Sequence, residues 1–203
     1  MEQVINKKTY ELSKIGEIIQ IILIVFGTLL VPAIVPQLLQ IIFGKTSWIA
    51  TNSQVIVGSI VNTALIIAGL NLKGWSKLIL VATLPSLSAI GSGYIFESLT
   101  KVTIFMIPGI WLGNFSLMML MKCLYANKKV NYAISAIISI ILKVVFIFGV
   151  LNIWMASDVL PYQGVVADTL RKTFGLTQII TATMGAVISF FIVRINIRKH
   201  NKN

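Results

Sequence analysis

The stretch Tyr132-Ala-Ile-Ser-Ala-Ile-Ile-Ser-Ile-Ile-Leu-Lys143-Val-Val-Phe-Ile-Phe-Gly-Val150 decides the fold of this chain. A helix needs about 20 predominantly apolar residues to cross the hydrocarbon core of a bilayer, so this run predicts a membrane span. Lys143 lies two helical turns or more from either end, too deep for its side chain to reach the interface without strain. A lysine at that depth costs roughly 2.5–3.5 kcal/mol on insertion scales, and its surroundings must offset that cost.

Two environments could compensate for Lys143. In the first, the lysine is structural and bonds to backbone carbonyls or amide side chains of neighbouring helices. In the second, which we favour, the lysine faces a polar cavity inside a helix bundle. Charged residues within membrane spans mark substrate or ion sites often enough to make the second reading the working hypothesis.

The composition of the whole chain agrees with a membrane protein. Of its 203 residues 57% are hydrophobic and 11% charged, and the mean hydropathy is +0.91. These values favour an integral membrane protein over a soluble domain. Because Cys123 is the single cysteine, an internal disulfide is excluded. His200 is the single histidine, so a metal cluster with cysteine and histidine ligands is excluded as well.

Hydrophobic runs predict an all-α integral membrane protein: a bundle of six transmembrane helices forming one domain over residues 1–203, after a basic leader that ends near Lys14. The first span is too long for one straight helix. Pro32 and Pro36 fall inside it, and an interior proline removes a hydrogen bond and kinks or breaks a helix. We therefore expect a broken, partly irregular piece from Ala33 to Phe43. The six predicted spans are residues 15–43, 53–72, 77–96, 103–125, 130–155 and 174–194.

Basic residues are distributed unequally between the two sides of this predicted bundle. Twelve fall on the side of the two termini and four on the other side. Because loops rich in lysine and arginine stay in the cytoplasm, both termini are predicted to be cytoplasmic. The net charge of +11 thus reflects orientation in a membrane, and we expect no nucleic-acid partner. The twelve are Lys7, Lys8, Lys14, Lys73, Lys77, Lys122, Lys128, Lys129, Arg194, Arg198, Lys199 and Lys202; the four are Lys45, Lys101, Arg171 and Lys172.

Polar residues inside the spans gather in the outer half of the bundle. Counting along the helices places Asn62 and Asn114 near the midplane and Lys143 slightly outside it. Intramembrane polar residues rarely face lipid, so this clustering predicts a pocket that opens outward. Taken singly, each of these polar residues more often forms a hydrogen bond between helices than a contact with a substrate. Ser86, Ser88 and Gln178 extend the cluster.

No carboxylate lies at the depth of Lys143. Glu17 belongs to the first span but falls near its inner end. An anionic substrate could supply the missing counter-charge. The sequence shows no motif of a catalytic site, because the spans contain no histidine, no carboxylate pair and no phosphate-binding or nucleophile motif. We therefore expect the protein not to be an enzyme and to need no cofactor. Any active transport would require ATPase partners.

Four stretches resemble a known family. Residues 52–65, NSQVIVGSIVNTAL, are similar to the pattern TGPLVNALL of one branch of the S components of energy-coupling-factor (ECF) transporters. Residues 107–114, IPGIWLGN, resemble its IPFIMLGN, and residues 141–143, ILK, its LLK. Residues 176–182, LTQIITA, resemble its LQLITAL. The four occur in the family's order over about two thirds of the chain.

The resemblance implies a multi-pass protein of a prokaryotic cell membrane that captures a small substrate from outside. S components bind a vitamin, a related micronutrient or a metal ion. They associate with a coupling membrane subunit and two ATPase subunits, and these partners hydrolyse the ATP. The absence of histidines from the pocket region argues against a metal cargo and leaves a vitamin-like molecule as the expected substrate. The anionic character of that molecule is expected from Lys143, which lacks a counter-charge.

The polar residues and the resemblance together give three sets of candidates. A gate is expected over the pocket between Ala33 and Ile49. A docking face for the coupling subunit is expected where small residues repeat at a spacing of four. The substrate-binding candidates are Asn62, Ser86, Ser88, Trp111, Asn114, Lys143 and Gln178; the gate candidates are Gln37, Gln40 and Trp48; the docking candidates are Ala64 and Ala68.

Two other functions remain open at this point. The chain could be a small membrane anchor or interaction subunit of a larger complex, whose polar residues only join helices. Lys143 and the interrupted first span argue against the function of a membrane anchor. A stand-alone ion-coupled carrier is disfavoured by the lack of intramembrane carboxylates and of inverted repeats.

Overall fold

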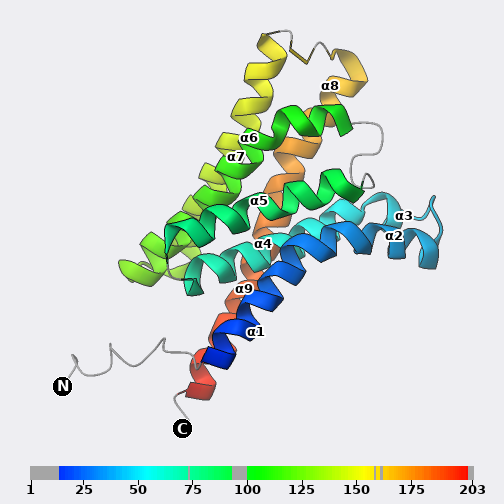
Figure 1. The fold of residues 1–203 in the computed structure, drawn as a ribbon. Helices are drawn as coiled ribbons and strands as arrows, with labels where there is room; N and C mark the ends of the chain where they lie inside the picture. Colours follow the sequence, from blue (N-terminus) through cyan, green and yellow to red (C-terminus); the bar gives the residue numbers. More distant parts are fainter. Residues whose placement is uncertain (1–13, 73, 93–99, 158, 161, 201–203) are drawn as a thin grey trace.

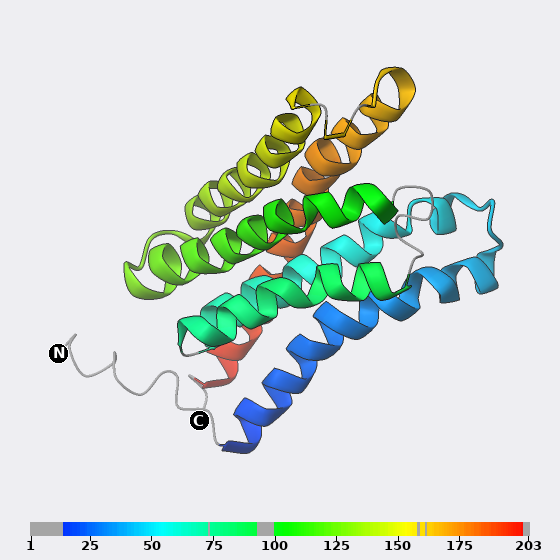
Figure 2. The same cartoon turned by 45° about the horizontal axis from the view of Figure 1, so that its top comes forward.

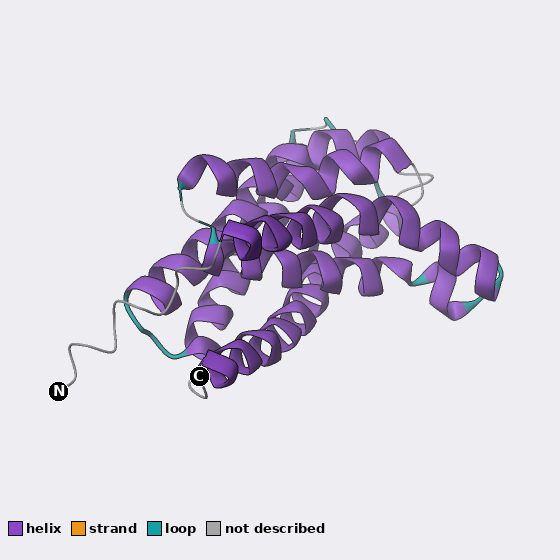
Figure 3. Ribbon diagram, turned by 60° about the horizontal axis from the view of Figure 1, so that its bottom comes forward, coloured by secondary structure: helices purple, strands orange, loops and turns teal. Residues whose placement is uncertain are grey.

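A computed structural model of the chain describes residues 14–72, 74–92, 100–157, 159–160 and 162–200. All regular elements in these ranges are helices (Figure 3). The predicted leader, and residues 93–96 of the predicted third span, lie outside the described residues. The elements are α1 (Lys14–Val25), η1 (Phe26–Leu30), α2 (Val31–Phe43), α3 (Trp48–Thr51), α4 (Ser53–Asn71), α5 (Trp75–Ser92), α6 (Thr100–Leu120), η3 (Met121–Asn127), α7 (Tyr132–Ala156), α8 (Gly164–Arg171), η4 (Lys172–Leu176) and α9 (Thr177–His200).

The first span is bent but remains helical throughout. The π-helical segment η1 joins α1 to α2 and ends just before Pro32, which occupies the first turn of α2. Proline has no N–H to donate to the preceding turn, and a π-helical turn is a common way to absorb that loss. Figure 2 shows the change of direction between the two helices. The predicted irregular backbone after Pro32 and Pro36 is therefore wrong, because α2 continues as a helix to Phe43.

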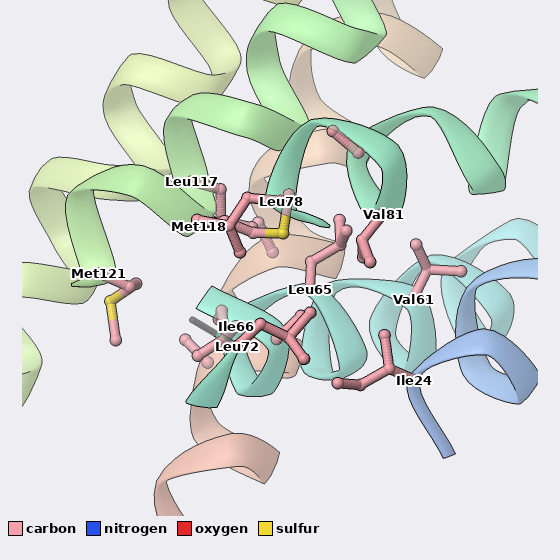
Figure 4. Packing of buried hydrophobic residues seen from close by; sticks show 14 of the residues in the cluster. Ile24, Val61, Leu65, Ile66, Leu72, Leu78, Val81, Leu117, Met118 and Met121 are labelled. Carbon is pink, nitrogen blue, oxygen red and sulfur yellow. The ribbon is translucent and has the colours of Figure 1, made fainter. Parts of the chain in front are cut away.

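Helix α4 lies at the centre of the bundle and packs against α1, α2, α5, α6 and α9. Its residues Leu65, Ile66 and Ala68 are completely buried. They belong to an apolar core that α1, α5 and α6 share (Figure 4). A second, smaller core joins the first part of α6 and the last part of α7 to α8 and η4.

Small residues bring α4 and α9 into close contact. A Cβ on Gly58 of α4 would lie 2.8 Å from Cγ2 of Thr181, and one on Gly185 of α9 would lie 2.6 Å from Cβ of Asn62. Only glycine permits such an approach. Both contacts advance by four residues in the same direction on the two helices, so α4 and α9 run parallel.

The helices between them alternate in direction. Trp111 and Asn114 of α6 bond to successively earlier residues of α5, Ser86 and Ala82, so α5 and α6 are antiparallel. Gly109 and Gly113 of α6 likewise pack against Val150 and Ile147 of α7, in reverse order. Figure 1 shows the start of α1 and the end of α9 at the same end of the bundle, opposite α3 and α8.

Five helices of the described residues are long and apolar enough to cross a membrane, which makes this a multi-pass, all-α protein in character. Isoleucines on their outer surfaces are exposed, among them Ile41 and Ile137. The last helix is longer than predicted, because α8, η4 and α9 form one run that begins ten residues before Phe174. The five are residues 20–43, 53–71, 104–127, 132–156 and 164–193; the remaining long helix is α5.

The predicted docking pair lies inside the bundle. Ala64 is 8% exposed and Ala68 is completely buried. Gly27 of η1 approaches Ala64 so closely that a Cβ on the glycine would lie 2.9 Å from the alanine Cβ. The spacing of small residues on α4 therefore serves packing of the chain's own helices, and the expectation of an exposed docking face at this pair is wrong.

Candidate functional site: a cavity around Lys143

Lys143 lies on the buried face of α7, with 2% of the residue exposed. Its Nζ donates hydrogen bonds to Oδ1 of Asn62 on α4, at 2.5 Å, and to Oδ1 of Asn114 on α6, at 2.9 Å. We call these three residues the lysine centre. Hydrogen bonds that involve a charged group are stronger than neutral ones, so they offset part of the cost of burying the ammonium.

Backbone and hydroxyl acceptors fix the orientation of both asparagines. Nδ2 of Asn62 donates to the carbonyl oxygen of Gly58, at 2.8 Å, and to Oγ1 of Thr181, at 3.3 Å. Nδ2 of Asn114 donates to the carbonyl oxygen of Ala82, at 3.1 Å. With the nitrogen ends occupied in this way, both amide oxygens are directed at the ammonium. Helices α4, α5, α6, α7 and α9 thus converge on one network.

No described carboxylate neutralises this ammonium. Asp168, on α8, is the acidic residue whose side chain the structure describes, and it pairs with Arg171 at 3.3 Å in an exposed position. Glu17, Glu97 and Asp158 have side chains outside the described residues. Amide oxygens solvate a cation through their dipoles but leave its full charge in place. The lysine centre therefore has no negative partner among the described residues.

A cavity of about 90 Å³ adjoins the lysine centre. A single water needs about 10–15 Å³ by the same kind of measure, so the space holds several waters or a small organic group. On α4 the lining extends from the middle of the helix to its first turn, on the side of α3. The cavity is lined by Pro32, Gln54, Val57, Gly58, Val61, Asn62, Pro85, Ser86, Ile110, Asn114, Lys143, Phe174, Gln178 and Thr181.

Of the seven predicted substrate-binding residues, five line this cavity: the lysine centre, Ser86 and Gln178. Trp111 does not line it, but its Nε1 donates to Oγ of Ser86 at 2.6 Å and so positions that hydroxyl. Ser88 does not line it either, because its hydroxyl donates to the carbonyl oxygen of Leu29 and joins α5 to η1. The role of the five in binding a substrate stays a prediction.

The predicted gate residues lie away from the cavity. Gln37 and Gln40 are half-buried on α2, and Trp48 is 74% exposed in the short helix α3. None of the three lines the cavity, whereas Pro32, at the start of α2, does. Movement of this segment stays a prediction, but direct contact of these side chains with the cavity is not present in the structure.

Several residues that line the cavity are absent from the site predicted from the sequence. Gln54, Gly58 and Thr181 belong to the stretches that resemble the ECF family, yet they were not singled out. Helical spacing could have found them, because residues four apart lie on one face. Steps of four from Asn62 reach Gly58 and Gln54. Phe174, the first residue of the predicted sixth span, carried no such signal, because it is apolar and follows none of the quoted motifs.

Comparisons with protein-family models, with curated proteins and with solved structures find no match to this chain.

Proposed function

We propose that this chain is the substrate-capture (S) component of an ECF-type importer. In this proposal it spans the cell membrane six times with both termini in the cytoplasm, and it binds a small anionic, vitamin-like molecule in the cavity around Lys143. A coupling membrane subunit and two ATPase subunits would drive transport. The observation that carries the proposal is a buried lysine that lines a cavity without a described carboxylate partner.

The ammonium has capacity for one more bond. Lysine carries three N–H donors, and the two asparagine oxygens account for two of them. A carboxylate of a ligand would accept the third hydrogen and neutralise the charge at the same time. A hydrogen bond to a charged group contributes about 1.5–3 kcal/mol, and the gain grows where water is excluded.

Convergence of the four family-like stretches supports the more specific assignment. They contribute Asn62, Asn114, Lys143 and Gln178 to one cavity, each from a different stretch. Four stretches that are distant in sequence thus each place one polar residue in the same cavity. Their meeting in one place is therefore an argument for a shared binding site.

The directions of the helices support six crossings. Helices α4 and α9 run parallel, with three long helices between them that alternate in direction. If α5 did not cross the membrane together with α6 and α7, the chain would enter α9 from the wrong side. Five helices plus α5 give six, the number expected from the sequence, and the twelve-to-four bias of basic residues orients them.

Native mass spectrometry of gently purified protein tests the proposal. We expect the wild-type chain to retain a small acidic molecule and Lys143→Met to lose it. Lys122→Met is the matched control: Lys122 is half-buried and donates to the carbonyl oxygen of Leu72 at the other end of α4, away from the cavity. Equal retention by wild type and Lys143→Met would contradict the assignment of Lys143.

One observation favours the second candidate, a membrane anchor without a ligand of its own. Every buried polar side-chain atom of the described residues has a hydrogen-bond partner, so the network is complete as a bond between helices. An anchor predicts that Lys143→Met lowers stability while no small molecule is retained by any variant. Co-purification with coupling and ATPase subunits, or with an unrelated complex, distinguishes the two functions.

A further inference from the structure

We propose that the cavity has a second recognition point, formed by Gln54 and Gln178, and that its ligand has two polar ends. One end is an anion held at the lysine centre. The other is a group that both donates and accepts hydrogen bonds, such as a carboxamide, lactam or ureide. This inference rests on the proposed function, because it requires the cavity to bind a ligand.

The two glutamines, here called the glutamine pair, lie at one level of the bundle. Gln54 is one turn before Gly58 on α4, and Gln178 is three residues before Thr181 on α9. Since Gly58 packs against Thr181 and the two helices run parallel, both glutamines face the cavity about one turn beyond that contact. The rise of 1.5 Å per residue places Gln54 about 12 Å along α4 from Asn62.

The glutamine pair provides hydrogen-bonding capacity that the other polar lining residues have already used. Ser86 accepts from Trp111 and donates to the carbonyl oxygen of Thr83. Thr181 accepts from Asn62 and donates to the carbonyl oxygen of Gln178. The side-chain amides of the glutamine pair, in contrast, make no hydrogen bond within the described part of the chain, although both residues are half-buried.

The chemistry of the lining selects the kind of ligand. Between the lysine centre and the glutamine pair the walls are apolar, with Val57 and Val61 on α4, Pro85 on α5, Ile110 on α6 and Phe174 on η4. Apolar walls with polar groups at two points are typical of sites that fix the orientation of a small molecule. A glutamine amide presents both a donor and an acceptor, so a group with the same two functions satisfies it best.

A set of three matched probes tests the inference on the full-length protein in lipid nanodiscs. The probes are 6-amino-6-oxohexanoate, which has both ends; hexanoate, which has only the anion; and hexanamide, which has only the amide. Isothermal titration calorimetry measures their affinities at millimolar concentration. We expect 6-amino-6-oxohexanoate to bind about three- to tenfold more tightly than hexanoate, as one additional neutral hydrogen bond provides.

Variants locate the effect. Gln54→Leu and Gln178→Leu keep the size of the side chain and remove the amide, so each should lower the affinity for 6-amino-6-oxohexanoate to that for hexanoate. Gln20→Leu is the matched control, since Gln20 on α1 is also half-buried but does not line the cavity. Thermal unfolding of each variant, measured in parallel, identifies any loss of folding, and the two leucine variants provide independent readings.

The outcomes separate this inference from the proposed function. Equal affinities for 6-amino-6-oxohexanoate and hexanoate, both lost in Lys143→Met, would overturn the glutamine pair and leave the anion site in place. Binding of neither carboxylate by the wild-type protein would overturn both proposals. Stronger binding of hexanamide than of hexanoate would refute the anion site, whatever the glutamine variants do.

Discussion

At the scale of single residues, the structure joins a buried ammonium to two amide oxygens rather than to a carboxylate. Lys143 lies between Asn62 and Asn114, each of which is held in turn by a neighbouring backbone carbonyl. This arrangement lowers the cost of burying an ammonium without placing a negative charge beside it. A partner carboxylate would have removed the charge and with it the attraction for an anionic ligand.

A double-mutant cycle between Lys143→Met and Asn62→Leu measures the bond between the two side chains. Lys143→Met leaves the amide oxygens of Asn62 and Asn114 without their donor, and Asn62→Leu leaves the ammonium with one acceptor fewer. The double variant removes both partners, so its loss in free energy of unfolding should be about 1.5–3 kcal/mol smaller than the sum of the single losses. Reversible unfolding in detergent micelles provides the measurement.

Ser189→Ala serves as the control for that cycle. The Ser189 hydroxyl pairs with the Tyr132 hydroxyl at 2.6 Å. Tyr132 is about 16 Å along α7 from Lys143 at the rise of a helix. When Ser189→Ala is combined with Lys143→Met, the losses in free energy of unfolding should be additive. A coupling as large as that with Asn62 would show that the variants perturb the whole bundle, and the specific bond would then lose its support.

At the scale of elements, glycines set the distance between α4 and α9 and therefore shape one wall of the cavity. Gly185 approaches Asn62 and the backbone nitrogen of Thr63, while Gly58 approaches Thr181. Because Asn62 and Thr181 also belong to the polar network, the same contacts that pack the helices hold the network in place. A change in helix separation would move the acceptor of the ammonium.

Gly185→Ala should destabilise the protein by about 1–3 kcal/mol, as overpacking of a close contact does. The added Cβ would lie 2.6 Å from Cβ of Asn62, so the helices must separate. Gly149→Ala on α7 is the control, because a Cβ there meets nothing within 4 Å. Its stability should be unchanged or higher by up to about 1 kcal/mol. Equal effects of the two variants in thermal unfolding would contradict this account of the α4–α9 contact.

The bend at η1 makes α2 and α3 the elements that we expect to move as a gate. Pro32 follows the π-helical segment and lines the cavity, so motion of α2 would change the cavity wall. Spin labels at Gln40 and Trp48 should change their mobility when 6-amino-6-oxohexanoate is added. A label at Ile137, exposed on α7, should not respond. Unchanged spectra at both gate positions would count against a gate here.

At the scale of the whole molecule, the asymmetric distribution of charge predicts how the bundle is oriented. Lys128 and Lys129 are exposed in the turn before α7, near Lys122, which caps the end of α4. Lys45 follows α2 at the opposite end. Under the positive-inside rule the first group faces the cytoplasm and Lys45 the outside.

Cysteine labelling in intact cells tests this orientation. In a Cys123→Ser background, Lys45→Cys should react with a membrane-impermeant maleimide, and Lys129→Cys should react only after the membrane is opened. For the crossing of α5, Lys77→Cys should behave like Lys129→Cys and Lys101→Cys like Lys45→Cys. Identical labelling of Lys77→Cys and Lys101→Cys would eliminate α5 as a span.

The sequence by itself determined the class of the protein, the approximate helices and the interior position of Lys143. Hydrophobic length and charge bias are local properties, so they can be counted along the chain. They located α4 and α7 to within a few residues, and depth counting correctly placed Asn62 and Asn114 at the level of the lysine.

The tertiary structure decided what depends on rotation of the helices and on contacts between them. It showed that Ala64 and Ala68 are buried, that Ser88 and Trp111 do not line the cavity, and that the first span stays helical past Pro32. Which face of a helix meets which neighbour depends on packing between distant segments, and hydropathy along a span that is apolar on all sides carries no record of it.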